Sequence, residues 1–145
     1  MGFVNLRKSW ELFMPSLFLL FSHKLTAAQM QDARQALQAA EFIALPEALQ
    51  ARWSNIPPEI AAIQEHLRPV FDWLGAQSQA GDYVLAQGDF GAVFLTVEFA
   101  RMHGLIPVYS TTRRQVVETT LPDGTVQAQH TFQHVRYREY PQASP

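Results

Sequence analysis

The stretch GDYVLAQGDFGA, residues 81–92, decides the fold that we expect of this chain. The apolar run at residues 84–86 is opened by Gly-Asp and closed by Gln-Gly-Asp, which predicts a short buried strand. Residues 90–103 are long and apolar enough for a helix, and a glycine follows at its expected end. A strand, a glycine-containing turn and a helix leave free backbone N–H groups at the helix start, where an anion is favoured. Gly88 and Gly91 would let a ligand approach this backbone, although an ordinary tight turn explains the same residues.

Strand and helix patterns alternate along the rest of the chain. Further strands are predicted at residues 17–21, 41–45 and 105–110. The predicted helices cover residues 26–40, which begin with a T-x-x-Q capping box, residues 47–53 and residues 60–74. Pro69 lies inside the last of these helices and should kink or split it. A β-hairpin is predicted from residues 116–120 and 126–134, around the turn Pro-Asp-Gly.

This order predicts an α/β domain whose mostly parallel sheet is flanked by helices and extended by a C-terminal β-hairpin. We interpret it as a Rossmann-like fold. We expect a single domain at residues 14–140, with residues 1–13 as an N-terminal extension and residues 141–145 as a tail.

Composition limits the classes of protein to consider. Hydrophobic residues make up 48% and aromatic residues 12% of the chain, which excludes a disordered protein. The formal net charge of -2 argues against binding to long nucleic acid. The absence of cysteine excludes disulfides, cysteine-based zinc sites and cysteine nucleophiles. No apolar run approaches the roughly 18 residues of a membrane span, and we expect a cytoplasmic protein with no membrane contact.

Ligands of such sheets bind beyond the carboxyl ends of the strands. That rule selects three polar loops, at residues 22–23, 87–89 and 110–114. In the last loop, Arg113 and Arg114 directly follow two threonines, so guanidinium groups lie beside hydroxyl donors. This combination suits phosphate oxygens, although a solvated turn explains adjacent arginines equally well.

Two histidines are candidates for proton transfer. His23 is either a catalytic proton carrier or an exposed neighbour of Ser22, which itself either contacts a ligand or ends its strand. Strand alternation would place five hairpin residues on one face, namely His130, Phe132, His134, Arg136 and Arg138. That face is either a cationic strip that closes over a ligand or a polar outer surface. His134 and Arg136 remain open as site residues.

Metal and dinucleotide chemistry have no sequence support. No HExxH, paired-aspartate or cysteine–histidine signature is present, and the dinucleotide-binding pattern GxGxxG is absent. We therefore expect neither a metal nor a cofactor.

Five stretches together resemble a small CRISPR-associated family. They are LFLLFSHKLT at 17–26, WSNIPP at 53–58, GDYVLAQGDFGA at 81–92, GLIPVYSTTRR at 104–114 and FQHVRYREY at 132–140. The chain is similar in these stretches to Csx-type accessory proteins of type III loci, which are related to proteins with CARF-like Rossmann folds. The resemblance covers nearly all of residues 14–140.

The resemblance implies binding of a cyclic oligoadenylate at a homodimer interface, and cleavage of the ring to switch off antiviral signalling. The expected catalytic residues are His23, Arg113, Arg114 and His134. The expected ligand-binding residues are Ser22, Gln87, Gly88, Asp89, Gly91, Ser110, Thr111, Thr112 and Arg136. Cyclic tetraadenylate is the expected ring, and no metal is required. The alternatives are a non-catalytic sensor that binds the same ring and acts through a partner protein, and an interaction subunit with no nucleotide site.

Overall fold

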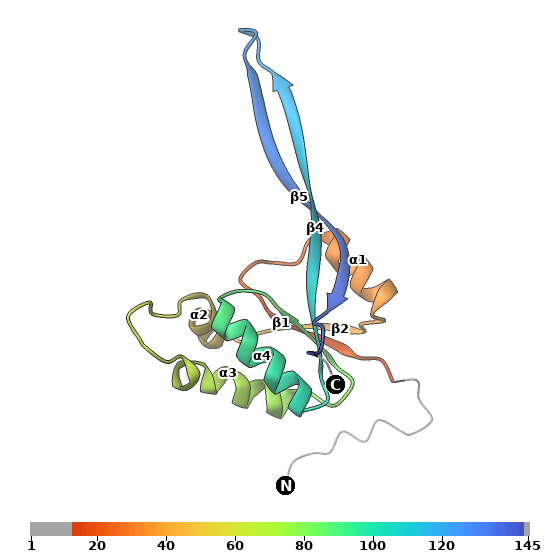
Figure 1. Ribbon diagram of the computed structural model, residues 1–145. Coiled ribbons are helices and arrows are strands. Elements are labelled where there is room, and N and C mark those ends of the chain that lie inside the picture. The colour runs from red at the N-terminus through yellow and green to blue at the C-terminus, as the bar shows by residue number, and fades with distance from the viewer. Residues whose placement is uncertain (1–12, 144–145) are drawn as a thin grey trace.

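A computed structural model describes residues 13–143 and shows one five-stranded sheet with helices on both faces (Figure 1). The elements are β1 (Ser16–Leu20), α1 (Ala27–Ala36), β2 (Glu41–Ala44), α2 (Glu47–Ser54), α3 (Gln64–Gln77), β3 (Tyr83–Ala86), α4 (Phe90–Met102), β4 (Ile106–Thr120) and β5 (Val126–Glu139). The prediction of an α/β domain with a helix-flanked sheet is confirmed. The expected extension at residues 1–13 falls outside the described part, except that a Cβ on Gly81 would come within 2.8 Å of the Phe13 ring.

The sheet has the strand order β2-β1-β3-β4-β5. The first four strands are parallel, and β5 runs antiparallel to β4. The chain moves from β1 outward to β2 and then returns to the other side of β1 to form β3. The direction of winding therefore changes between β1 and β3, so the loops after these two strands leave in opposite directions and open a crevice between them.

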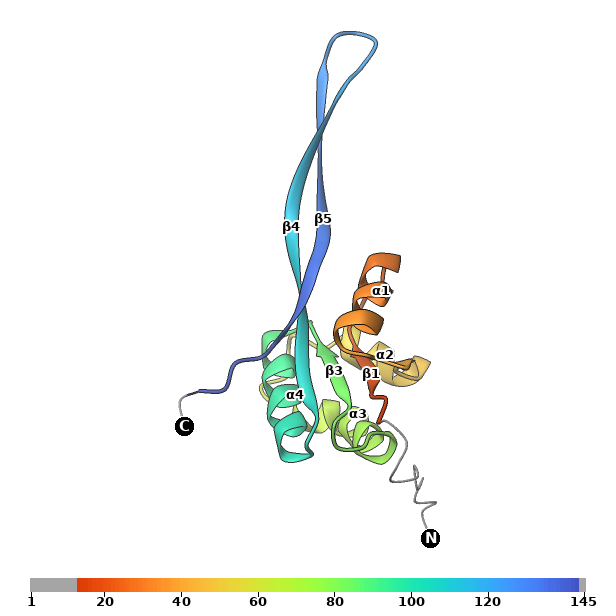
Figure 2. The same cartoon turned by 90° about the vertical axis from the view of Figure 1, so that its right-hand side faces the viewer.

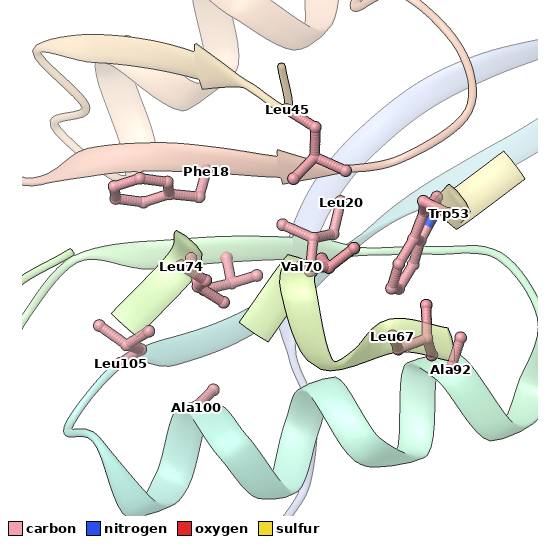
Figure 3. Packing of buried hydrophobic residues seen from close by; sticks show 11 residues of the cluster. Phe18, Leu20, Leu45, Trp53, Leu67, Val70, Leu74, Ala92, Ala100 and Leu105 are labelled. Carbon is pink, nitrogen blue, oxygen red and sulfur yellow. The ribbon is translucent and has the colours of Figure 1, made fainter. Parts of the chain in front are cut away.

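The core has one layer on each face of the sheet. Alternation along β1 sends Leu17 toward α1 and sends Phe18 and Leu20 toward α2, α3 and α4. Figure 3 shows the second layer, where Phe18 and Leu20 lie over Leu74 and Trp53. These side chains are nearly or completely buried, and each contributes about 1.5–3 kcal/mol to folding. The uninterrupted apolar sequence of β1 is therefore explained by burial of both faces of the strand.

The capping box that was predicted for α1 is present. Gln29 donates its backbone N–H to the Thr26 hydroxyl at 3.2 Å, and the Thr26 N–H donates to the Gln29 side-chain oxygen at 2.9 Å. The helix ends at Ala36, before the predicted end, because the chain turns at Gln38, which has a φ of 55°.

Helix α3 differs from its sequence prediction in where it begins. It starts at Gln64, so Ile60 lies outside it and is exposed. Pro69 lies inside the helix but does not split it. The apolar stripe from Leu67 through Leu74 is fully buried, and this packing offsets the backbone hydrogen bond that a proline cannot donate.

The loop that was predicted at residues 110–114 does not exist. Strand β4 continues without interruption from Ile106 to Thr120 and pairs along its length with β5. The predicted fourth strand and the predicted hairpin are thus one long hairpin, whose outer part extends away from the rest of the molecule (Figures 1 and 2). We call residues 113–133 the arm. Nearly every residue of the arm is exposed, so no burial pattern distinguished these strand residues from a polar loop.

A β-bulge at Val135 changes which residues share a face. Thr111 pairs with Arg136, but Thr112 pairs with His134, so Val135 is an extra residue in β5. The predicted single face from 130 to 138 is therefore wrong, because Arg136 points away from His134. On the hairpin, the residues on the side of α1 are Thr112, Arg114, Val116, Glu118, Thr120, Val126, Ala128, His130, Phe132 and His134. We call this the α1-side face.

Candidate functional site

A crevice lies where the strand order predicts one, between the carboxyl ends of β1 and β3. The pairing of Leu20 with Ala86 brings the two following loops together. Phe21, Ser22, His23, Gln87 and Gly88 line a cavity there of about 260 Å³. Two of the three loops that were selected from the sequence therefore meet in space.

A larger cavity of about 810 Å³ adjoins this crevice and shares Phe21, Ser22 and His23 with it. Its remaining lining comes from Leu19 of β1, from β2 and α2 with the residues that follow them, from residue 30 of α1 and from the Lys24–Leu25 loop, and it is mostly apolar. At its rim, Gln50 donates to the Phe21 carbonyl at 3.0 Å and to the Ser54 hydroxyl at 3.0 Å. Ser54 donates in turn to the Ser22 hydroxyl at 3.1 Å. The sequence had not indicated that α2 contributes Gln50 and Ser54 to this edge.

His23 is the histidine at this edge whose ring is available to a ligand. It is exposed, and its ring lies edge-on to Phe21 with the ring centroids 5.4 Å apart. Between residues 13 and 143, no hydrogen bond or ion pair involves either nitrogen of the His23 ring. Both nitrogens can therefore exchange protons with a bound molecule.

The residues around Gly88 make contacts within the chain. The Gln87 side-chain oxygen accepts the Ser110 N–H at 2.8 Å, and the Gln87 carbonyl accepts the Trp53 indole N–H at 3.4 Å. A Cβ on Gly88 would stand 3.1 Å from that indole nitrogen. The close approach that a glycine permits here is thus made by Trp53, and ligand contact at Gly88 stays a prediction.

The start of α4 is also occupied by the chain itself. Asp89 accepts the Ala92 N–H at 2.9 Å and so caps the helix with a carboxylate. Gly91 lies against Ile63, to which a Cβ at this position would come within 3.0 Å. The negative charge of Asp89 fills the place that was predicted for an anion, which weakens that part of the expected site.

A chain of side-chain hydrogen bonds joins the base of the hairpin to α1. The Asp32 carboxylate lies 2.7 Å from His134 Nε2, and the Ser110 hydroxyl lies 2.6 Å from His134 Nδ1. Gln29 donates to the same hydroxyl at 3.3 Å. With the proton on Nε2 donated to Asp32, Nδ1 accepts from Ser110, and every group has its partner. The His134 side chain is 4% exposed.

This chain changes the role that His134 can have. Because both of its ring nitrogens are engaged, His134 can reach a ligand only through the Ser110 hydroxyl. Sequence reasoning identified Ser110 and His134 but missed Gln29 and Asp32. The available signal was the spacing of these two polar residues, three apart on α1 and so on one face of the helix.

The paired arginines do not act as a pair. Neighbouring strand residues point to opposite faces, so Arg114 shares the α1-side face with Thr112, whereas Arg113 lies on the other face with Thr111 and Arg136. The Arg114 guanidinium lies 3.1 Å from His130 Nδ1. At ~3.3 Å per residue, both arginines are roughly 10–13 Å beyond Ser110, and neither borders the crevice.

A third cavity, of about 440 Å³, lies between the start of α1 and the base of the arm. It is lined by Thr26, Ala28, Gln29, Thr112, Phe132, Gln133 and His134. The segment from residue 22 to residue 29 therefore borders all three cavities, with His23 at the first two and Thr26 at the third.

Tyr137 fixes the base of the arm and makes the fold sensitive to alkali. Its hydroxyl donates to the Gln29 carbonyl at 3.0 Å. Burial, and second the charge of Asp32, raise the pKa of Tyr137 well above its ordinary value of about 10. Above that pH the unfolded chain loses a proton that the folded chain keeps. The contribution of Tyr137 to stability is therefore complete below pH 10 and is lost as the pH rises above it.

We expect the free energy of unfolding to fall above pH 10, with Tyr137 adding at most about 1.4 kcal/mol per pH unit to the slope. Tyr137→Phe should lower stability at neutral pH, through the lost hydrogen bond, and should make the alkaline slope shallower. Urea unfolding between pH 8 and pH 11 measures both effects. Tyr109→Phe, on the opposite face of the hairpin, is the control. An unchanged slope in Tyr137→Phe would contradict the assignment.

A family model described as the uncharacterized protein MJ1673 family matches residues 15–138. The chain belongs to this family. It is 48% identical over 127 residues to uncharacterized protein MJ1673 of Methanocaldococcus jannaschii, an alignment that covers 88% of this chain and 98% of the relative. No solved structure matches the chain.

Residues 13–143 contain no group of three or more His, Asp or Glu side chains that could hold a metal ion. None of their helices is both long and apolar enough to cross a membrane.

Proposed function

We propose that this protein is a metal-independent ring nuclease, which binds cyclic oligoadenylate and cleaves it to end type III CRISPR signalling in the cytoplasm. We further propose that its α/β domain is a Rossmann-like, CARF-like domain, because the order β2-β1-β3-β4 and the change of winding between β1 and β3 are typical of such folds. The active form in this proposal is a homodimer that takes small cyclic nucleotides rather than long nucleic acid.

One observation carries the proposal: His23 lines both cavities at this sheet edge, and neither nitrogen of its ring has a hydrogen-bond partner among the described residues. A nucleobase needs a largely apolar cavity with a few polar groups at its rim, and the cavity near Gln50 and Ser54 has that character and sufficient volume. The phosphate and ribose would then lie toward Gln87 and His23.

The chemistry requires no metal and no protein nucleophile. The ribose 2′-oxygen forms a bond to the adjacent phosphorus, the bond from phosphorus to the 5′-oxygen breaks, and the ring opens with a 2′,3′-cyclic phosphate at one end. The 2′-OH loses a proton and the 5′-oxygen gains one. Holding the 2′-oxygen in line with the breaking bond accounts for much of the rate increase.

The residues would divide this work unequally. In this proposal His23 carries one of the two protons, and the second is assigned to the Ser110 hydroxyl, which is hydrogen-bonded to His134, itself bonded to Asp32. Of the two arginines, Arg114 shares a face with Thr112 and His134, but neither arginine borders the crevice, so this scheme assigns no arginine to the phosphate. Arg113 and Arg136 point away and have no part in this scheme.

The test is incubation with cyclic tetraadenylate and cyclic hexaadenylate in EDTA, followed by chromatography for linear products. We expect cleavage of the tetraadenylate ring without added metal. Tight binding of a ring without cleavage would refute the nuclease and support the sensor. The sensor is compatible with His134, because both nitrogens of its ring are hydrogen-bonded within the chain and binding alone requires no proton transfer by it. Failure to bind either ring would refute both functions.

A further inference from the structure

The arm is amphipathic although, among the elements of residues 13–143, only those at its base lie beside it (Figures 1 and 2). Its α1-side face carries the apolar side chains Val116, Val126, Ala128 and Phe132. The opposite face carries Arg113, Gln115, Val117, Thr119, Gln127, Gln129, Thr131 and Gln133, of which one is apolar. Antiparallel strands with this alternation normally pack one face and expose the other to solvent.

A two-stranded ribbon is at best marginally stable in water when nothing covers it. Val116 and Phe132 are 53% and 68% exposed, and the ribbon continues to the pair Thr120–Val126, beyond the cavity that Phe132 lines at the start of α1. A face that carries these exposed apolar side chains and is held out from the molecule in both views calls for a covering surface (Figures 1 and 2).

We propose that the covering surface is the same face of the arm in a second copy of the chain. Charge decides the occupant and the alignment. Arg114 and Glu118 stand on the α1-side face, equally spaced on either side of Val116. A two-fold axis beside Val116, with the arms antiparallel, brings each Arg114 to Glu118 of the partner subunit, so one surface complements itself. The two ribbons then pack face to face about 10 Å apart, as layers of a β-sandwich do.

This alignment also covers the third cavity. With the axis beside Val116, the pair formed by Thr112 and His134 faces the pair formed by Thr120 and Val126 of the partner subunit, and Val126 is 61% exposed. This apolar side chain of the partner subunit would lie over the cavity that Phe132 lines at the start of α1. The dimer would thus complete the wall of a cavity that is open in one protomer.

Two neighbouring valines give a matched test, because they are equally exposed and lie on opposite faces. Val116 is 53% exposed on the α1-side face and Val117 is 49% exposed on the polar face. Sedimentation equilibrium without nucleotide should show a dimer for the unmodified protein. Val116→Asp should weaken the dimer at least tenfold, and Val117→Asp should leave it nearly unchanged. A monomeric unmodified protein, or equal effects of the two variants, would overturn the proposal.

Charge exchange supplies a test that does not depend on the stability of the hairpin. Arg114→Glu and Glu118→Arg each set like charges against each other across the axis and should weaken the dimer, whereas the double variant should restore it. Arg113→Glu, on the other face, is the control. If the double variant does not restore the dimer, the alignment is overturned. Phe94 lies on the exposed face of α4, and a dimer that is lost in Phe94→Asp but survives Val116→Asp would overturn the alignment as well. These dimer measurements contain no cyclic oligoadenylate, so their failure would refute the interface without refuting the nuclease.

Discussion

Replacement of His23 by alanine should lower the single-turnover rate of ring cleavage by about 10²–10⁴-fold, the usual contribution of a positioned proton carrier. Its ring is exposed at the crevice, and neither ring nitrogen is engaged within the described residues. Affinity for the ring should change much less than the rate, since the imidazole acts mainly on protons that move in the transition state. Rapid-quench measurement at saturating protein separates the rate from the affinity.

Two other histidines test the specificity of this effect. His103 follows α4 at the opposite edge of the sheet, so His103→Ala should cleave at the normal rate. His134→Ala removes the hydrogen bonds that the imidazole makes with Ser110 and Asp32. It should therefore lower the free energy of unfolding as well as the cleavage rate. A His23→Ala protein that cleaves normally would show that the proton passes through Ser110 or that the crevice is not the site.

The parts of the fold that were predictable are those with a local cause. The apolar runs of β1 and β3 are buried on both faces, so their strands could be read from composition alone. The capping box at Thr26 predicted where helix α1 begins. Because the carboxyl ends of parallel strands share an edge, the meeting of His23 with Gln87 also followed from strand order.

The parts that were not predictable depend on distant residues or on exposure. Residues 111–114 are polar and exposed, so nothing in them distinguishes a strand from a loop until the pairing partner is known. The bulge at Val135 shifts the alternation by one residue, which placed Arg136 on the wrong face in our prediction. The bond between Asp32 and His134 joins positions 102 residues apart, a separation over which no spacing rule applies.

The largest effect on stability should come from Asp82, which the sequence presented only as the residue that opens β3. Its side chain is 2% exposed and holds two backbone donors from different segments. One carboxylate oxygen accepts the Ser16 N–H at 2.9 Å, at the start of β1, and the other accepts the Gln79 N–H at 2.9 Å. The carboxylate thereby ties the start of β1 to the turn that precedes β3.

Asp82→Ala should lower the free energy of unfolding by about 2–6 kcal/mol, because two backbone N–H groups lose a charged acceptor at once and each unpaired donor costs about 1–3 kcal/mol. Asp82→Asn keeps one acceptor oxygen and should lose less. Asp72→Ala removes an exposed carboxylate on α3 and should stay within about 0.5 kcal/mol of the unmodified protein. Urea unfolding with unchanged m-values measures all three. If Asp82→Ala is as stable as Asp72→Ala, water must hydrogen-bond to the Ser16 and Gln79 N–H groups in place of the carboxylate. The start of β1 would then be accessible to solvent.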